Sequence, residues 1–125
     1  MTEDNEEKLL KSFPDLFMTD TLGIPKFGGF QCGDGWYDLI RELSEKIDYE
    51  KTMQFGEESR ELYAMQVKEK YGTLRFYMNV AIPEVNDLIW EYEAKSAVTC
   101  ERCGKPGKIR DTSWIQTLCD EHNRQ

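Results

Sequence analysis

The sequence contains very little histidine: His122 is the only one in 125 residues. An enzyme that moves protons usually needs a free histidine, a pair of convergent carboxylates or a metal with an open coordination position. His122 belongs to a metal-binding pattern, and the many carboxylates are scattered over predicted helix faces. We therefore predict no catalytic residues and a protein that is not an enzyme. A hydrolase-type activity is the weakest of the interpretations considered.

Long apolar runs are also absent. No stretch approaches the roughly 18 consecutive apolar residues of a membrane span. The segment Met1-Thr-Glu-Asp-Asn-Glu-Glu is acidic, unlike a signal or transit peptide. The 39% hydrophobic content is typical of a globular fold of this length. We therefore expect a cytoplasmic protein with reduced thiols and no membrane partner.

Basic residues are few: 16 Lys and Arg stand against 24 Asp and Glu, a net charge of −8. Residues 1–65 hold 15 acids and 7 bases, whereas residues 66–125 hold 9 of each. Broad affinity for nucleic acid depends on a basic surface, so the charge disfavours it. The charge favours solubility, or more specifically an acidic face for a basic partner.

The four cysteines include a C-x2-C pair, followed after 15 residues by C-x2-H: Cys100, Cys103, Cys119 and His122. This spacing predicts one tetrahedral zinc ion. Four protein ligands leave no position for water, so the expected role is structural. A redox pair or a disulfide is the alternative, but the βαβ context and the oxidising compartment that these need are not indicated.

The zinc ligands also predict the local fold. Cys100 to Gly104 suits a zinc knuckle, and residues 109–118 are long enough for a hairpin. Thr117 could cap a helix that carries Cys119 and His122 on one face. Knuckle, hairpin and helix in this order predict a treble-clef-like module over residues 98–125, packed on an α+β domain over residues 1–97.

Periodicity predicts the rest of the fold. Helices are expected over residues 3–12, from Trp36 to Ile47 with Asp34 as N-cap, and from Pro83 onward, with residues 51–60 as a loop. Residues 62–70 and 73–80 form the best hairpin, joined by Tyr71-Gly72. The side chains expected to face the core are Met65, Val67, Leu74, Phe76 and Met78. The fold class is therefore α+β, with helices on one face of a small antiparallel sheet.

Two further features have a functional and a structural interpretation. The glycines at 28, 29, 33 and 35 lack the G-K-[ST] ending of a phosphate loop, which favours a tight turn into a helix. Cys32 precedes a helix N-terminus, which could lower the pKa of its thiol, but no base lies beside it in the sequence. We expect Cys32 to be a buried structural thiol.

Candidate contact residues lie on the hairpin and in the zinc module. Lys68, Lys70, Arg75 and Tyr77 are expected on the outer sheet face, as a solvated surface or a phosphate contact. Arg75 is expected to pair with a nearby acid such as Glu69, or with a carboxylate of a protein partner. Trp36 and Trp90 are expected to be buried, whereas Trp114 is the candidate interface residue.

Three stretches together resemble a family of small uncharacterised proteins of bacteria, prophages and phages. They are Cys32-Gly-Asp-Gly-Trp-Tyr-Asp-Leu-Ile40, Val67-Lys-Glu-Lys-Tyr-Gly-Thr-Leu-Arg-Phe-Tyr77, and Cys100-Glu-Arg-Cys-Gly-Lys-Pro-Gly107 with Trp114-Ile-Gln-Thr-Leu-Cys-Asp-Glu-His122. The resemblance implies no activity. It implies a bacterial or phage accessory protein in the bacterial cell or an infected host, and by analogy one that binds a host protein.

Two binding functions follow as hypotheses. The first is a non-enzymatic, zinc-stabilised module that acts through a protein partner as a regulator or inhibitor. The second is a nucleic-acid or nucleotide binder that uses the hairpin bases together with Lys105, Lys108 and Arg110 of the zinc module. The partner and the oligomeric state do not follow from the sequence.

Overall fold

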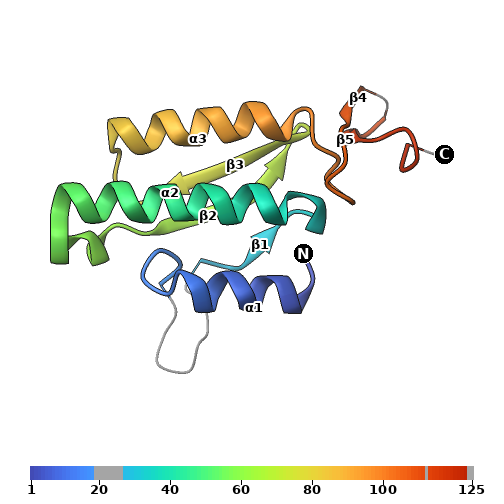
Figure 1. Ribbon diagram of the computed structural model, residues 1–125. Coiled ribbons are helices and arrows are strands. Elements are labelled where there is room, and N and C mark those ends of the chain that lie inside the picture. Colours follow the sequence, from blue (N-terminus) through green and yellow to red (C-terminus); the bar gives the residue numbers. More distant parts are fainter. Residues whose placement is uncertain (19–26, 112, 124–125) are drawn as a thin grey trace.

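The chain has an α+β fold in the computed structural model, which describes residues 1–18, 27–111 and 113–123 (Figure 1). The helices are α1 (Glu3–Ser12), α2 (Tyr37–Phe55) and α3 (Pro83–Ser96), with the short 3-10 helices η1 (Asp34–Trp36) and η2 (Gly56–Glu61). The strands are β1 (Phe30–Gln31), β2 (Ala64–Lys70), β3 (Thr73–Met78), β4 (Lys108–Asp111) and β5 (Ile115–Leu118). The predicted fold class and the predicted central hairpin are therefore confirmed.

The main sheet has the strand order β1-β2-β3. β2 and β3 form the antiparallel hairpin, and Tyr71 and Gly72 form its two-residue turn with φ of 53° and 85°. Positive φ at both turn positions matches the right-handed twist of the flanking strands. β1 adds parallel to β2, which the sequence did not predict, so the sheet is mixed. β3 is left as an edge strand.

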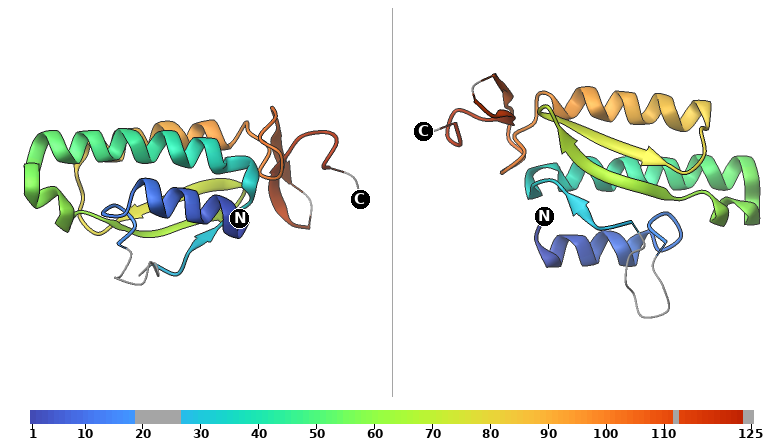
Figure 2. Two further views of the ribbon diagram at one scale, coloured as in Figure 1. Left: turned by 60° about the horizontal axis from the view of Figure 1, so that its bottom comes forward. Right: turned by 180° about the vertical axis from the view of Figure 1, so that it is seen from behind.

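The helices lie against one face of this sheet. α2 and α3 run side by side across it, and α1 lies beside β1 (Figure 2). The buried residues of α2 include Ile40, Leu43 and Ile47, which follow the predicted helical spacing, and Trp36 is fully buried just before them. Phe17, Phe27 and Phe30 add an aromatic cluster that reaches Phe76 of β3. None of the helices in the described residues is long and apolar enough to cross a lipid bilayer.

The predicted loop over residues 51–60 is wrong. α2 continues to Phe55, and η2 follows it directly. Lys51 explains the continuation, because its side chain is only 2% exposed and its Nζ donates a hydrogen bond to the carbonyl oxygen of Ser59 at 2.9 Å. A buried lysine needs such a partner, and a polar sequence does not reveal the burial.

The strand pattern fails at one position. Met65 was expected in the core but is 53% exposed, because the register shifts between Ala64 and Gln66. An extra residue in one strand of a pair turns the following side chains to the opposite face. Ala64 and Val67 are the buried residues of β2 as a result.

Asp34 is not the predicted cap of the following helix. The N-cap of η1 is Gly33, which makes no side-chain capping bond. The Asp34 carboxylate instead accepts hydrogen bonds from the backbone N–H of Thr2 at 2.8 Å and the amide of Asn5 at 3.0 Å. Asp34 therefore fixes the start of α1 against the start of α2.

Candidate metal centre

The structure brings the four predicted ligands together. The ligand atoms of Cys100, Cys103, Cys119 and His122 all lie within 4.8 Å of one another. The Cys103 and Cys119 Sγ atoms are 3.7 Å apart, and His122 Nδ1 lies 3.3 Å from Cys119 Sγ and 3.7 Å from Cys100 Sγ. Four donor atoms from two distant chain segments thus converge on one point.

These distances suit a tetrahedral metal ion. A tetrahedral centre with metal–sulfur bonds of about 2.3 Å and metal–nitrogen bonds of about 2.0 Å places two sulfurs about 3.8 Å apart, and a sulfur about 3.5 Å from the nitrogen. A disulfide instead requires a sulfur–sulfur distance of about 2.05 Å. All four cysteines of the chain are free. The cluster is therefore compatible with metal binding.

The electrostatics of the cluster favour a thiolate at Cys100. Burial alone would raise the pKa of this thiol, but hydrogen bonds from the backbone N–H groups of Cys119, Cys103 and Arg102 lower it to about 6. The pKa of Cys103 is raised: the Lys105 backbone N–H favours its thiolate, but burial and the neighbouring Cys100 and Cys119 thiols outweigh that effect. Adjacent thiolates repel one another, and a bound cation removes this repulsion.

The first ligand pair lies on a tight turn. The N–H of Cys100 donates to the carbonyl oxygen of Lys105 at 2.8 Å, and the N–H of Gly104 donates to the carbonyl oxygen of Cys100 at 2.9 Å. Gly104 has φ of 81°, a conformation that glycine adopts without strain. This tight turn lies where the knuckle was predicted, and we refer to residues 100–104 as the knuckle turn.

The second pair follows the β4–β5 hairpin, as predicted, but the helix expected for it is not formed in the described residues. Thr117 lies in β5, and Asp120 to His122 form a turn directly after Cys119. The Thr117 hydroxyl donates to the carbonyl oxygen of Gly72, and that contact holds the residue in the strand. Arg110 fixes the turn by donating to the carbonyl oxygen of Leu118 and to the carboxylate of Asp120.

The glycine-rich segment is the docking surface of the knuckle. A Cβ at Gly35 would come within 2.1 Å of the Cys100 carbonyl oxygen, and one at Gly33 within 2.4 Å of the Glu101 carbonyl oxygen. The Gly35 N–H donates to the Glu101 carbonyl oxygen at 2.7 Å, and the Gly33 N–H donates to the Glu101 carboxylate at 2.9 Å. Gly33 and Gly35 therefore serve close backbone approach, whereas Gly28 and Gly29 have φ of 70° and 87°, as expected for a tight turn.

The same contact includes the indole of Trp36, whose Nε1 donates to the carbonyl oxygen of Thr99 at 2.9 Å. Burial raises the pKa of the Glu101 carboxyl in this interface, although the Gly33 N–H opposes the shift. Cys32, just before this segment, is buried, and burial raises the pKa of its thiol to about 12. Cys32 is therefore a buried thiol whose charged form is disfavoured, as expected.

The predicted strip of bases is largely occupied by local contacts. Arg75 pairs with Glu93 of α3 at 3.3 Å rather than with Glu69, whose carboxylate accepts from the Gly72 N–H. Lys70 lies over the ring of Tyr71. Among the bases of the C-terminal segment, Lys105 pairs with Glu121 and Arg110 with Asp120.

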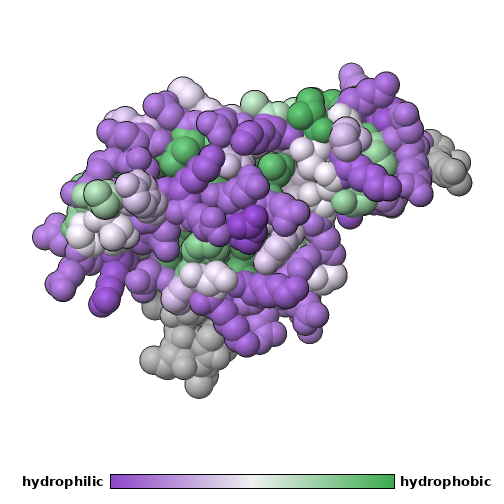
Figure 3. All heavy atoms as spheres, in the orientation of Figure 1, coloured by the Kyte–Doolittle hydropathy of each residue, from purple (hydrophilic) through white to green (hydrophobic). Residues whose placement is uncertain are grey.

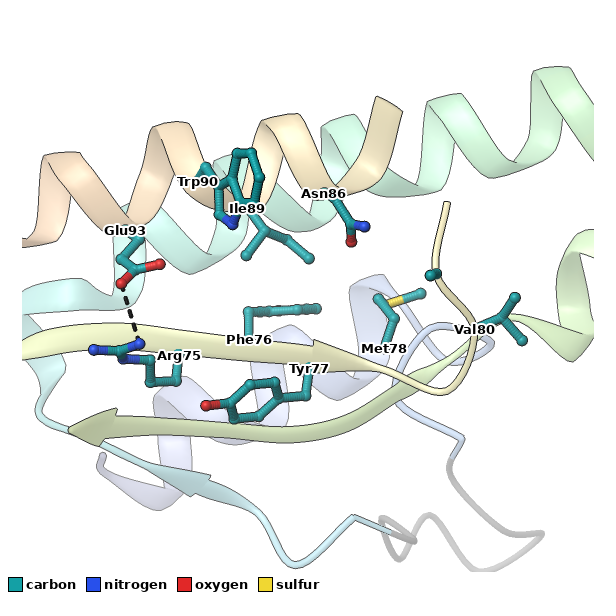
Figure 4. A pocket seen from close by; sticks show the side chains of 10 residues that line it. Arg75, Phe76, Tyr77, Met78, Val80, Asn86, Ile89, Trp90 and Glu93 are labelled. Atoms are coloured by element: carbon teal, nitrogen blue, oxygen red, sulfur yellow. Dashed lines mark ion pairs between the residues drawn. The ribbon is translucent and has the colours of Figure 1, made fainter. Parts of the chain in front are cut away.

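A groove between β3 and α3 was not predicted. It has a volume of about 340 Å³. Its lining residues are Arg75, Phe76, Tyr77, Met78, Val80, Ala81, Asn86, Ile89, Trp90 and Glu93 (Figure 4). Trp90 was expected to be buried but is 68% exposed, and Trp114 is 69% exposed. The sequence does carry a signal, because Trp90 falls outside the apolar helical spacing of Val85, Leu88, Ile89 and Tyr92.

Most of the surface formed by α2 and α3 is hydrophilic (Figure 3).

No protein-family model matches the chain, and neither the curated proteins nor the solved structures contain a significant match to it.

Proposed function

We propose that this protein is a non-enzymatic, zinc-stabilised binding module that acts through a protein partner as a regulator or inhibitor. The observation that carries the proposal is the groove between β3 and α3, whose lining includes three exposed large apolar residues: Tyr77, Val80 and Trp90. Clustered exposed apolar residues of this kind mark interaction sites, and aromatic residues contribute most of the affinity at interfaces.

Zinc is the metal that best suits the four-residue cluster. Three thiolates and one imidazole are a common zinc donor set, and this set fills a tetrahedral sphere. The order of knuckle, hairpin and second ligand pair is that of a treble-clef-like module, although its second pair lies on a turn. We assign the ion a structural role, in which Cys100, Cys103, Cys119 and His122 hold the C-terminal segment against Gly33 and η1.

The nucleic-acid hypothesis has less support. Three of its six bases, Arg75, Lys105 and Arg110, lie in ion pairs with Glu93, Glu121 and Asp120. Each such pair lowers the positive charge that the surface offers to phosphate. The net charge of −8 repels a polyanion in addition.

Elemental analysis of protein purified without added metal tests the metal assignment. We expect about one zinc per chain, and less than a tenth of that in Cys119→Ser. Another metal at stoichiometric level, or none, would contradict the assignment.

Affinity capture from a bacterial lysate, with and without nuclease, tests the partner class. We expect a stoichiometric protein that nuclease treatment does not release. Mobility-shift titrations with single- and double-stranded DNA and RNA complete the test. Submicromolar, salt-sensitive binding that Lys68→Ala/Arg75→Ala abolishes would replace the proposal with the nucleic-acid function.

A further inference from the structure

The open edge of β3 forms the floor of the groove. Lys70 and Thr73 flank the two-residue turn, so they form a hydrogen-bonded pair, and such pairs alternate along an antiparallel ladder. Thr73, Arg75 and Tyr77 therefore direct their backbone groups toward β2. The backbone groups of Leu74, Phe76 and Met78 point away from it.

Of these three residues, only Leu74 has a hydrogen-bond partner among the described residues for an outward-pointing backbone group. The Leu74 N–H donates to the Ser96 Oγ of α3 at 2.8 Å. The outward groups of Phe76 and Met78 have no partner in the described parts of the chain. An unpaired row of donors and acceptors on an edge strand is complementary to another strand.

The walls of the groove fit the side chains of such a strand. α3 supplies Ile89 and Trp90 on one side, and Tyr77 of β3 is exposed on the other (Figure 4). Arg75 and Glu93 join the two elements at one end through their ion pair. Successive residues of an added strand would point alternately toward α3 and toward the Tyr77 side. Arg75 Nε is buried without an acceptor, so the groove wall also holds an unused donor.

The charge of the wall distinguishes between occupants. α3 carries four acids and one base: Glu84, Asp87, Glu91, Glu93 and Lys95. Glu93 pairs with Arg75, and Glu91 pairs with Lys46 and Lys95, so Glu84 and Asp87 supply the unpaired negative charge of this helix in the described parts of the chain. Antiparallel pairing of β3 with β3 of a second copy would bring two such helices to the same face of a joint sheet. Like charges in that position are unfavourable, whereas Lys or Arg on a peptide is attracted.

We propose that β3 binds an extended segment of the partner protein by strand addition. The segment has about four paired residues, apolar side chains at alternate positions, and flanking lysine or arginine. This inference rests on the proposed function as a protein-binding module. It adds the chemistry of the partner and the site at which it binds.

A selection experiment tests the chemistry. A phage-displayed library of random twelve-residue peptides is selected on wild-type protein after depletion on Trp90→Ala. We expect sequences with alternating apolar residues and a basic flank. Trp90→Ala should weaken their binding by at least about tenfold, whereas Trp114→Ala, which removes an equally exposed tryptophan, should leave it unchanged.

Backbone pairing is tested separately from apolar contact. Each selected peptide is made in two N-methylated forms, one for each set of alternate residues. Methylation of the set that faces β3 should abolish binding, and methylation of the other set should not. In the complex, amide hydrogen exchange at Phe76 and Met78 should slow at least about tenfold, while exchange at Arg75 and Tyr77, already paired with β2, should change little.

Three outcomes would overturn the inference. They are the absence of Trp90-dependent peptides, equal binding by both N-methylated forms, and a concentration-dependent dimer in which Phe76 and Met78 are protected without peptide. The lysate capture separates this failure from that of the proposed function. A protein captured equally by wild type and Trp90→Ala keeps the function and rejects the groove, whereas no captured protein rejects the function itself.

Discussion

Asp34 and the glycines on either side of it join three segments that are far apart in the sequence. The Asp34 carboxylate reaches Thr2 and Asn5 in the first turn of α1, and the neighbouring glycine N–H groups reach Glu101 in the knuckle. Residues 33–35 thus contact both the start of α1 and the turn that carries Cys100 and Cys103. At the residue scale, this stretch is where substitutions should have the largest effects.

Asp34→Ala should lower the free energy of unfolding by about 1 kcal/mol at pH 7, because it removes two hydrogen bonds at a largely solvated site. Hydrogen bonds from Thr2, and to a lesser degree from Asn5, lower the folded pKa of Asp34 below 3.8. This stabilisation is therefore present above the unfolded pKa and is lost as the pH falls through the folded pKa. Urea unfolding at pH 7, 4 and 3 should show the difference between variant and wild type shrinking. Asp34→Asn, which keeps an acceptor without the charge, should lose most of the pH dependence.

Gly35→Ala should separate the knuckle from α2. The new Cβ would meet backbone atoms of Cys100 and Glu101, which cannot rotate away. We expect a loss of roughly 2–4 kcal/mol in unfolding free energy and at least tenfold weaker metal retention against a chelator, measured by a chromophoric competition assay. Gly56→Ala is the control: its positive φ makes it strained, but nothing lies within 4 Å, so metal retention should not change. Equal retention in both variants would contradict the docking role.

The hairpin of β2 and β3 contributes to two sites at once. Its turn contacts β5 through Gly72 and Thr117, and its open edge forms the floor of the groove. At the scale of elements, the hairpin therefore connects the metal module to the proposed binding surface.

Thr117→Val tests the contact between the turn and β5. Valine keeps the shape of threonine but leaves the carbonyl oxygen of Gly72 without its buried donor, which should cost about 1–3 kcal/mol in unfolding free energy. Thr73→Val removes a comparable but exposed hydroxyl bond to the Lys70 carbonyl oxygen and should cost less than about 0.5 kcal/mol. Chemical denaturation of both variants at saturating zinc provides the measurement. Similar losses would show that the Thr117 contact adds nothing special.

At the scale of the whole molecule, the buried residues form two separate apolar clusters. Cys100, Leu118 and Cys119 form the small one, separate from the large cluster around Trp36 and Val67. The division into residues 1–97 and 98–125 stays a prediction, which loss of the metal can test.

Cys119→Ser should remove the metal and lower hydrogen-exchange protection over residues 98–111 and 113–123 first. The docked N–H groups of Gly33 and Gly35 should lose protection with them, because Glu101 is their acceptor. Residues 40–47 and 64–78 should keep theirs, since they belong to the large core. Cys32→Ala, which replaces a buried cysteine outside the cluster, should retain the metal. Simultaneous loss of protection throughout residues 36–78 would contradict the division.

The sequence predicted the features that depend on local spacing. The clustering of the three cysteines with His122, the three long helices and the hairpin turn follow from periodicities and short motifs that are visible within a few residues. The helix expected for Cys119 and His122 is not formed in the described residues. β1 was missed because two residues carry no alternation, and the bulge at Met65 because a register shift leaves composition unchanged. The burial of Lys51 and the exposure of Trp90 depend on which elements pack together, and spacing alone does not determine this.

The partner of the glycine segment could not be predicted for a related reason. A glycine that avoids a distant carbonyl oxygen and a glycine that permits a turn are identical in sequence. Gly33 and Gly35 are explained only when Cys100 and Glu101 are placed beside them. The groove likewise depends on strand order, because β3 lies at an edge of its sheet and its outer side is not covered by another strand of the described chain.

The docking of the knuckle on the glycine segment has a consequence for the order of folding. The Gly33–Glu101 hydrogen bond closes a loop of 68 residues, whereas Cys103 and Cys119 are 16 residues apart. The entropy cost of loop closure rises with loop length, so we expect the contact between Cys103 and Cys119 to form before the contact between Gly33 and Glu101. A bound metal ion would strengthen this more local contact. We therefore expect the C-terminal segment to fold around its ion before it docks on the glycine segment. The rate at which the N-terminus of α2 acquires its final contacts should then depend on the concentration of free zinc.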